Sequence, residues 1–81
     1  MDLNSTFLFN FGKDTNLYYK LLKEEDFDFK TKNISLNILN SGEKIKVELS
    51  SNSVLELKIG TSALIKSLEI IEKTLNAIKN G

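Results

Sequence analysis

Carboxylates are the only side chains dense enough in this chain to suggest catalysis or metal binding. They cluster in one short segment, at Glu24, Glu25, Asp26 and Asp28. A calcium loop needs oxygen ligands at fixed spacing and a turn-forming glycine, and a two-carboxylate hydrolase needs a cleft and a partner group. The segment has neither pattern. We therefore predict a solvated loop there, with no catalytic residue, no metal and no cofactor.

Two further features carry weaker chemical signals. The pair Tyr18 and Tyr19 suits base stacking, but Tyr18 falls on the apolar stripe of a predicted helix, which leaves one exposed ring. Gly60 precedes a predicted helix N-terminus, where an anion can bind. A strand-to-helix turn explains this glycine without a ligand, and we favour that interpretation.

The composition excludes several classes of function. The 81 residues include no His, Cys, Trp or Pro, which excludes imidazole catalysis, thiolate chemistry, disulfides and the usual zinc sites. Eleven basic and eleven acidic residues give zero net charge and no long-range attraction to nucleic acid or anionic membranes. The N-terminus has no basic region followed by a long apolar run, so we expect no signal peptide, no membrane span and a cytoplasmic location.

The chain is expected to form one domain, residues 1–81, because it is too short for two cores. Residues 3–11 alternate between apolar and other side chains, which predicts a strand with three inward rings, Phe7, Phe9 and Phe11. A stripe of apolar residues then predicts a helix of about three turns, with Leu17, Tyr18, Leu21 and Leu22 on its buried face.

Three short segments in the second half alternate with period two and are separated by turns. They predict an antiparallel meander over residues 33–39, 44–50 and 54–59. Gly60 is expected to end the last strand, and Thr61 or Ser62 to cap a closing helix that runs to about Lys79. The predicted fold is α+β, a two-layer sandwich in the order β-α-β-β-β-α. Its antiparallel sheet of 3–4 strands has two helices on one face.

The closing helix has more apolar surface than a small sheet requires. One stripe suits the core and comprises Leu64, Leu68, Ile71, Leu75 and Ile78. A second stripe beside it is small and uncharged, and small residues let another helix approach closely. We interpret it either as packing on the first helix or as a partner interface. We predict a partner interface formed by Ala63, Ser67, Ile70, Thr74 and Ala77.

The segment "EKIKVELSSNSVLELKIGTSALIKSLEIIEKTL" resembles the small Pcc-type subunits of the KEOPS (EKC) tRNA-modification complex. Members have a hairpin that runs straight into a helix with an Ala-Leu-Arg-Ala-Ser-x-Asn-type signature. Ala63, Leu64 and Ser67 match it, whereas Ile65 stands in place of the Arg and Glu69 in place of the Asn. These departures indicate a divergent paralogue.

The resemblance implies a non-catalytic dimerisation and scaffold subunit for tRNA threonylcarbamoyladenosine (t6A) modification. Such a subunit would pair with itself or a paralogue and dock by its helices on the threonylcarbamoyl-transferase subunit, so that tRNA is met only through the complex. The alternative is a small double-stranded-RNA-binding-like module, because three strands followed by a helix also occur there. An enzyme built on Asp26 and Asp28 is the least favoured interpretation.

Overall fold

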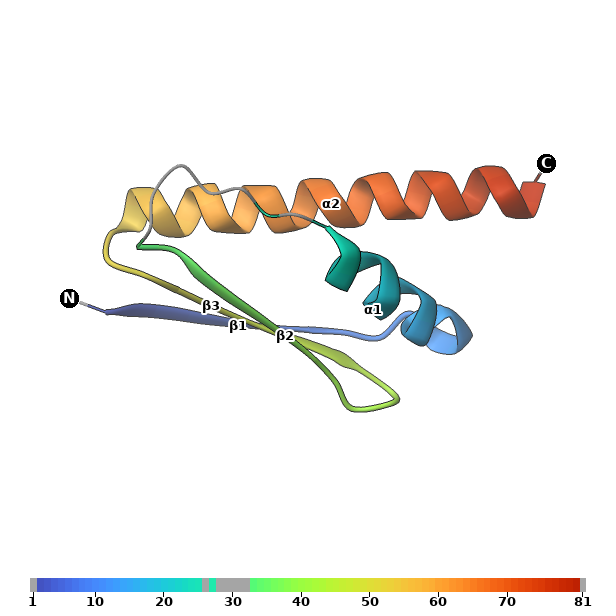
Figure 1. Ribbon diagram of the computed structural model, residues 1–81, viewed down its shortest axis with the longest axis horizontal. Coiled ribbons are helices and arrows are strands. Elements are labelled where there is room, and N and C mark those ends of the chain that lie inside the picture. Colours follow the sequence, from blue (N-terminus) through green and yellow to red (C-terminus); the bar gives the residue numbers. More distant parts are fainter. Residues whose placement is uncertain (1, 26, 28–32, 81) are drawn as a thin grey trace.

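The chain folds as a three-stranded antiparallel sheet with two helices on one face (Figure 1). The computed structural model describes residues 2–25, 27 and 33–80. The sheet with two helices on one face confirms the predicted α+β two-layer class. The sheet order is β1-β3-β2. The elements are β1 (Leu3–Phe9), the short 3-10 turn η1 (Gly12–Asp14), α1 (Thr15–Glu24), β2 (Ser35–Asn40), β3 (Ile45–Ser51) and α2 (Val54–Asn80).

The central strand β3 supplies the floor of the core. Its inward residues Ile45, Val47 and Leu49 are fully buried, as their alternation predicts. Val47 lies opposite Phe7 on one side and Ile38 on the other, so the inward faces of all three strands form a continuous apolar surface. Burial of this surface under the helices is the main stabilising term of the fold.

The turn after β1 sets the position of α1. Gly12 has a φ of 62°, a backbone conformation that favours glycine. The Oγ1 of Thr15 accepts a hydrogen bond from the amide of Phe11 at 3.1 Å and donates one to the carbonyl of Gly12 at 2.8 Å. These bonds fix the start of the helix, which then buries Tyr18 and Leu22 in the core.

The predicted strand over residues 54–59 is wrong, because this segment forms the first turns of α2. The amide of Glu56 donates to the Oγ of Ser53 at 3.1 Å. The Oε1 of Glu56 in turn accepts from the amide of Asn52 at 3.3 Å. This is a capping-box arrangement, with the Glu side chain reaching back before the helix start. It begins the helix at Val54 instead of near Thr61.

Gly60 does not break the chain but lies buried in the interior of α2. A β-carbon on it would come within 2.8 Å of Cδ1 of Leu49 and 3.2 Å of Cγ2 of Ile34. The missing side chain therefore lets α2 approach the sheet closely. Glycine costs roughly 1 kcal/mol relative to alanine in a helix interior, and packing against Leu49 offsets that cost here.

Most of the predicted core stripe of α2 is confirmed. Leu64, Leu68, Ile71 and Leu75 are buried, but Ile78 is 71% exposed. The reason is length, since 27 helical residues span about 40 Å, whereas the seven residues of β3 span only about 23 Å. The last turns of α2 extend beyond the sheet (Figure 1).

The capping box makes a direct prediction for stability. We expect Ser53→Ala to lower the free energy of unfolding by about 1 kcal/mol, because the amide of Glu56 loses its acceptor. The matched change Ser62→Ala, at an exposed interior position of the same helix, should instead raise it by a few tenths of a kcal/mol. Urea denaturation of the two variants measures both signs. An unchanged midpoint for Ser53→Ala would contradict the observed helix start.

Candidate protein-interaction surface

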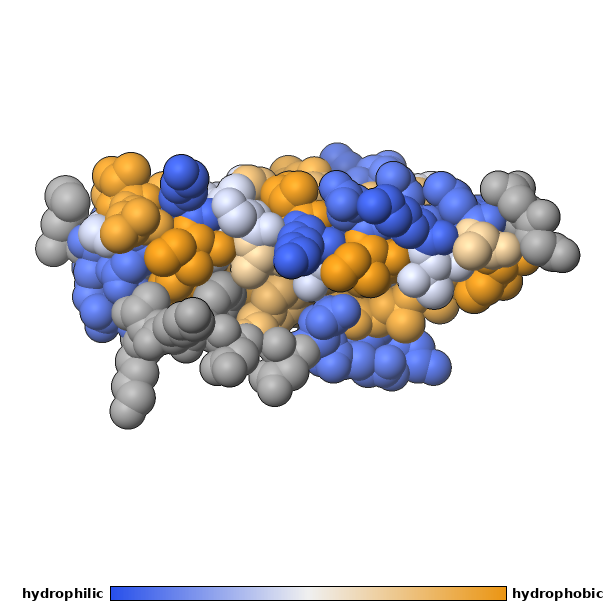
Figure 2. Space-filling view, turned by 90° about the horizontal axis from the view of Figure 1, so that it is seen from above, coloured by the Kyte–Doolittle hydropathy of each residue, from blue (hydrophilic) through white to orange (hydrophobic). Residues whose placement is uncertain are grey.

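α2 carries large apolar side chains that lie outside the core. Those of Val54, Leu55, Ile59, Ile65, Ile70 and Ile78 are between 44% and 71% exposed. Figure 2, which looks down on the molecule, shows apolar groups at the N-terminal end of α2 and again along its length, separated by charged residues. Single exposed apolar residues are ordinary, but their repetition along one helix is typical of an interaction surface.

The predicted interface stripe is divided by the fold. Ser67 is buried, Ala63 is half-buried, and Thr74 and Ala77 are exposed, while Ile70 is 50% exposed. We call the outer part of this stripe, with Ile59 added, the α1-side flank: Ile59, Ala63, Ile70, Thr74 and Ala77.

A groove of about 330 Å³ separates the α1-side flank from α1. Ile70, Ile71 and Thr74 of α2 line one wall, and Leu21, Glu24 and Glu25 line the other. The hydroxyl of Thr74 donates to the carbonyl of Ile70 at 2.9 Å, so it needs no further partner. The stripe thus packs on the first helix only in part, and the remainder is an apolar wall with an acidic rim.

The opposite side of α2, which faces β1, was not recognised as a surface from the sequence. We call it the β1-side flank: Ile65, Glu69 and Glu72, together with Val54 and Lys58, which helical spacing places on the same side. A second groove, of about 230 Å³, lies between this flank and the aromatic residues of the first strand and helix. Its lining comprises Phe9, Phe11, Tyr18, Ile65, Leu68, Glu69 and Glu72.

β1 has an open outer edge. Among the described residues it pairs with β3 on one side only, and it has one-to-one register from Leu3 to Phe9 without a bulge. The strand contains no charged residue and no proline. Native edge strands are usually protected by charges, prolines or bulges, because unpaired backbone groups attract further strands. β1 has none of these protections.

The chemical candidates of the sequence gain no support from the geometry. Glu24 and Glu25 are exposed at the end of α1, and Asp26 and Asp28 lie outside the described residues. Among residues 2–25, 27 and 33–80, no three acidic, His or Cys side chains gather as metal ligands would. Gly60 is far from the N-terminus of α2, which contradicts the anion-site interpretation.

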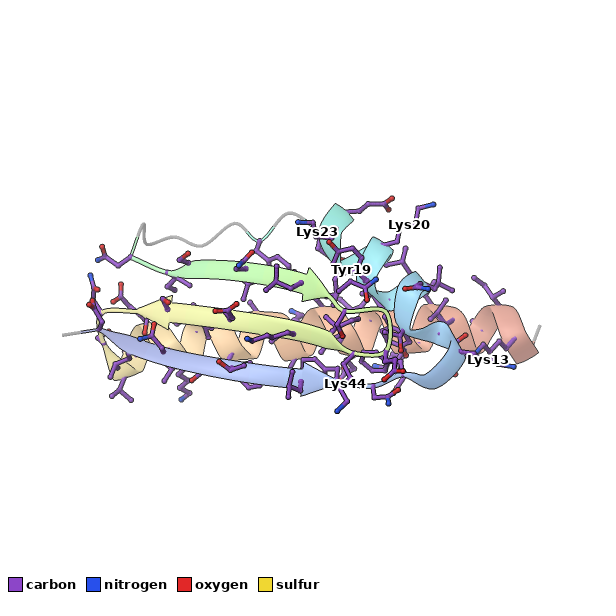
Figure 3. All side chains as sticks on the ribbon, turned by 90° about the horizontal axis from the view of Figure 1, so that it is seen from below. Lys13, Tyr19, Lys20, Lys23 and Lys44 are labelled. Atoms are coloured by element: carbon purple, nitrogen blue, oxygen red, sulfur yellow. The ribbon has the colours of Figure 1, made fainter. Side chains whose placement is uncertain are left out.

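Four basic side chains of the described residues lie at different edges of the molecule. Figure 3 shows Lys20 and Lys23 projecting from α1 along one edge of the molecule, and Lys13 and Lys44 near the opposite edge. Tyr19 is half-buried against the core rather than free for stacking. On the open face of the sheet, Leu8, Lys46 and Leu39 form one row, and Thr6, Glu48 and Asn37 form the next. The strand positions described on that face therefore include no aromatic residue.

One signal in the sequence would have located the missed part of the surface. The spacing Ser53-x-x-Glu56 is that of a capping box, which marks a helix start. A helix from Val54 places Leu55 and Ile59 outside the core, whereas a strand over the same residues would place them inside. Leu55 is 67% exposed in the structure.

Comparisons with known proteins identify no relative. The chain matches no protein-family model, no curated protein and no solved structure. In the described part of the chain, no helix has the length and apolar content needed to cross a membrane. The surface of α2 and the open edge of β1 are thus the features on which a function can be argued.

Proposed function

We propose that this protein is a non-catalytic dimerisation and scaffold subunit that acts by binding other proteins. The observation that carries the proposal is the row of exposed apolar side chains along both flanks of α2. A domain of this size has a stability of only a few to about 12 kcal/mol, so burial of such a surface would be a large contribution. The two flanks suit two different contacts.

The first contact is a dimer through β1. Antiparallel pairing of β1 with the same strand of a second copy, about a two-fold axis near Thr6, would join two sheets into one of six strands. Its uncharged and unbulged edge favours this pairing. The axis stands perpendicular to the sheet, so both α2 helices would lie on the same face.

The second contact is a partner helix on the α1-side flank. The groove beside Ile70 and Thr74 offers an apolar wall, and helices pack at axial distances of about 8–10 Å, depending on the side chains at the contact. The resemblance to Pcc-type subunits names the partner to test, the threonylcarbamoyl-transferase subunit of a KEOPS-like complex. Helices on one face of the sheet and a hairpin that leads directly into α2 support that resemblance.

The interface assignment is tested by changing the α1-side flank. We expect Ile70→Lys together with Ala77→Lys to weaken binding of the co-expressed transferase subunit at least about tenfold, because two charges would be buried against it. The matched control, Ser62→Lys with Asn76→Lys, adds the same charge at exposed polar positions of the same helix. Unchanged pull-down by the first variant would show that this flank is not the interface.

The dimer is tested separately at the centre of β1. Thr6 lies opposite Glu48 within one chain, so Thr6→Lys should leave the monomer stable. In the dimer, two lysines would face each other across the axis, and like charges directly opposite cost up to about 1 kcal/mol. We expect the dissociation constant measured by light scattering to rise roughly fivefold, whereas Thr6→Val should leave it unchanged. A dimer insensitive to Thr6→Lys would mean that another surface pairs.

The double-stranded-RNA-binding alternative loses the observation on which it depended. Only β2 and β3 lie between the two helices in the described chain, and the first turn of α2 carries Glu56 instead of a group of lysines. A gel-shift titration at low salt distinguishes it, since micromolar and salt-sensitive RNA binding by the isolated protein would favour RNA recognition over the scaffold role.

A further inference from the structure

We propose that the groove between β1 and α2 is the receptor for the N-terminal turns of α2 from a second copy, with Lys58 of that copy seated beside Glu69 and Glu72. This inference rests on the proposed β1 dimer and adds to it the residues that hold the two helices together. It follows from the lining of the groove, its charge and the symmetry of the pairing.

Phe9, Phe11 and Tyr18 line one wall of the groove and belong to an aromatic stack. Phe7, Phe9, Phe11 and Tyr18 follow one another as near-parallel rings, with interplanar angles of 9°, 11° and 6° and centroid separations of 6.2, 5.8 and 3.8 Å. The three phenylalanines are only half-buried in the single chain. Aromatic rings bury large apolar areas in cores and interfaces, so this wall would be stabilised by a covering apolar group.

The rim of the groove is acidic. Glu72 makes no ion pair within the described residues, and Glu69 contacts only Lys73, at 3.3 Å, with both side chains largely exposed. An exposed pair of this kind contributes little. Burial raises the pKa of Tyr18, and the carboxylates of Glu72 and Asp14 raise it further. An apolar wall below two carboxylates suits a lysine, whose hydrocarbon stem packs while its ammonium stays at the rim.

The symmetry of the dimer brings such a lysine to the groove. β1 and α2 both run antiparallel to β3, and Gly60 lies over Leu49, the partner of Ser5 in β1. Thr6 lies one residue beyond Ser5 along the strand, a distance of about 3.3 Å. Along α2 the same distance is about two residues at 1.5 Å each. The axis therefore passes close to the level of Ser62.

Residues of the β1-side flank at about equal distances before and after Ser62 then lie level with one another in the two copies. Lys58 of one copy comes level with the segment from Ile65 to Glu69 of the other, within reach of both carboxylates. Val54 of the second copy, whose side chain is 70% exposed in the single chain, would lie at the end of the groove near Glu69 and Glu72. Its apolar side chain would cover the aromatic wall. Both contacts occur twice, because the interface is the same on both copies.

Charge reversal tests this arrangement on the full chain. We expect Lys58→Glu to raise the dimer dissociation constant about tenfold or more at low salt, because two attractive contacts become repulsive. The matched control Lys66→Glu makes the same change on the outward side of α2 and should leave the constant within about threefold. Adding Glu69→Lys and Glu72→Lys to Lys58→Glu should restore dimerisation, which a general loss of stability would not do.

The outcomes separate this inference from the dimer itself. A wild-type chain that scatters as a monomer up to millimolar concentration would overturn both. A dimer that Thr6→Lys weakens, but that Lys58→Glu and Lys66→Glu affect equally, would leave the β1 pairing in place and overturn the groove contact. Failure of the triple variant to dimerise better than Lys58→Glu alone would also overturn it.

Discussion

Ser62→Pro is expected to lower the free energy of unfolding by about 3 kcal/mol or more. Ser62 lies in the interior of α2, where proline removes the amide that bonds to the carbonyl four residues earlier and its ring clashes with that carbonyl. The side chain itself is exposed, so no loss of packing contributes. Against a total stability of a few to about 12 kcal/mol, this change would remove about a quarter of the stability or more.

The matched variant is Val54→Pro. Val54 is the first residue of α2, and the amide of Leu57 bonds to the carbonyl of Ser53 at 3.0 Å. Proline is favoured at the first helical position, since its missing amide has no partner there. We expect Val54→Pro to cost less than about 1 kcal/mol. Denaturation curves that rank the two variants in the opposite order would place the helix start near Thr61 and restore a strand over residues 54–59.

Leu64→Ala is expected to cost about 2–5 kcal/mol. The side chain of Leu64 is fully buried against the sheet, so its removal loses apolar burial and leaves a cavity. Urea denaturation should show a lower midpoint with a similar slope, because the surface exposed on unfolding changes little.

The neighbouring residue provides the control for this prediction. Ile65 is 47% exposed, and Ile65→Ala should cost less than about 1 kcal/mol in the monomer, measured at protein concentrations below those at which the chain pairs. Equal losses for the two variants would mean that α2 is rotated about its axis relative to the sheet. That rotation would also remove Ile65 from the proposed groove.

The sheet and the buried side of α2 follow largely from side-chain periodicity. Period two along residues 34–38 and 45–49 places the apolar residue at every second position inward, and Ile38, Ile45, Val47 and Leu49 are buried as predicted. A shift of one residue would expose the whole set, so the pattern determines the faces strongly. The same argument with period 3.6 identifies Leu64, Leu68, Ile71 and Leu75.

Periodicity failed at residues 54–59 for a definable reason. Six residues of alternating apolar and charged character fit a strand, but they also fit the start of an amphipathic helix, because short runs do not distinguish the two periods. The choice between strand and helix depended on Ser53 and Glu56. The hydroxyl of Ser53 donates to the Glu56 carboxylate and accepts from the Glu56 amide, which stabilises the helix start. It also depended on Gly60, whose role is set by Leu49, a residue distant in sequence.

For the predicted interface residues, too, the sequence pattern identified the stripe, whereas the tertiary structure decided its exposure. The composition and spacing of Ala63, Ser67, Ile70, Thr74 and Ala77 identify a second, uncharged stripe on α2 but not what covers it. The structure buries Ser67 and leaves Ile70 half exposed beside a groove. Val54 and Lys58 were assigned to a strand, so the β1-side flank had no counterpart in the sequence interpretation.

The sequence by itself determined the class of fold, the inward face of each observed strand and the buried stripe of α2. These features depend on the spacing of apolar residues within one segment, which can be read directly from the sequence. Only the tertiary structure decided where α2 begins, which two strands form the edges of the sheet and which apolar side chains remain outside the core. Those depend on contacts between residues far apart in the chain, such as Gly60 with Ile34 and Phe7 with Val47.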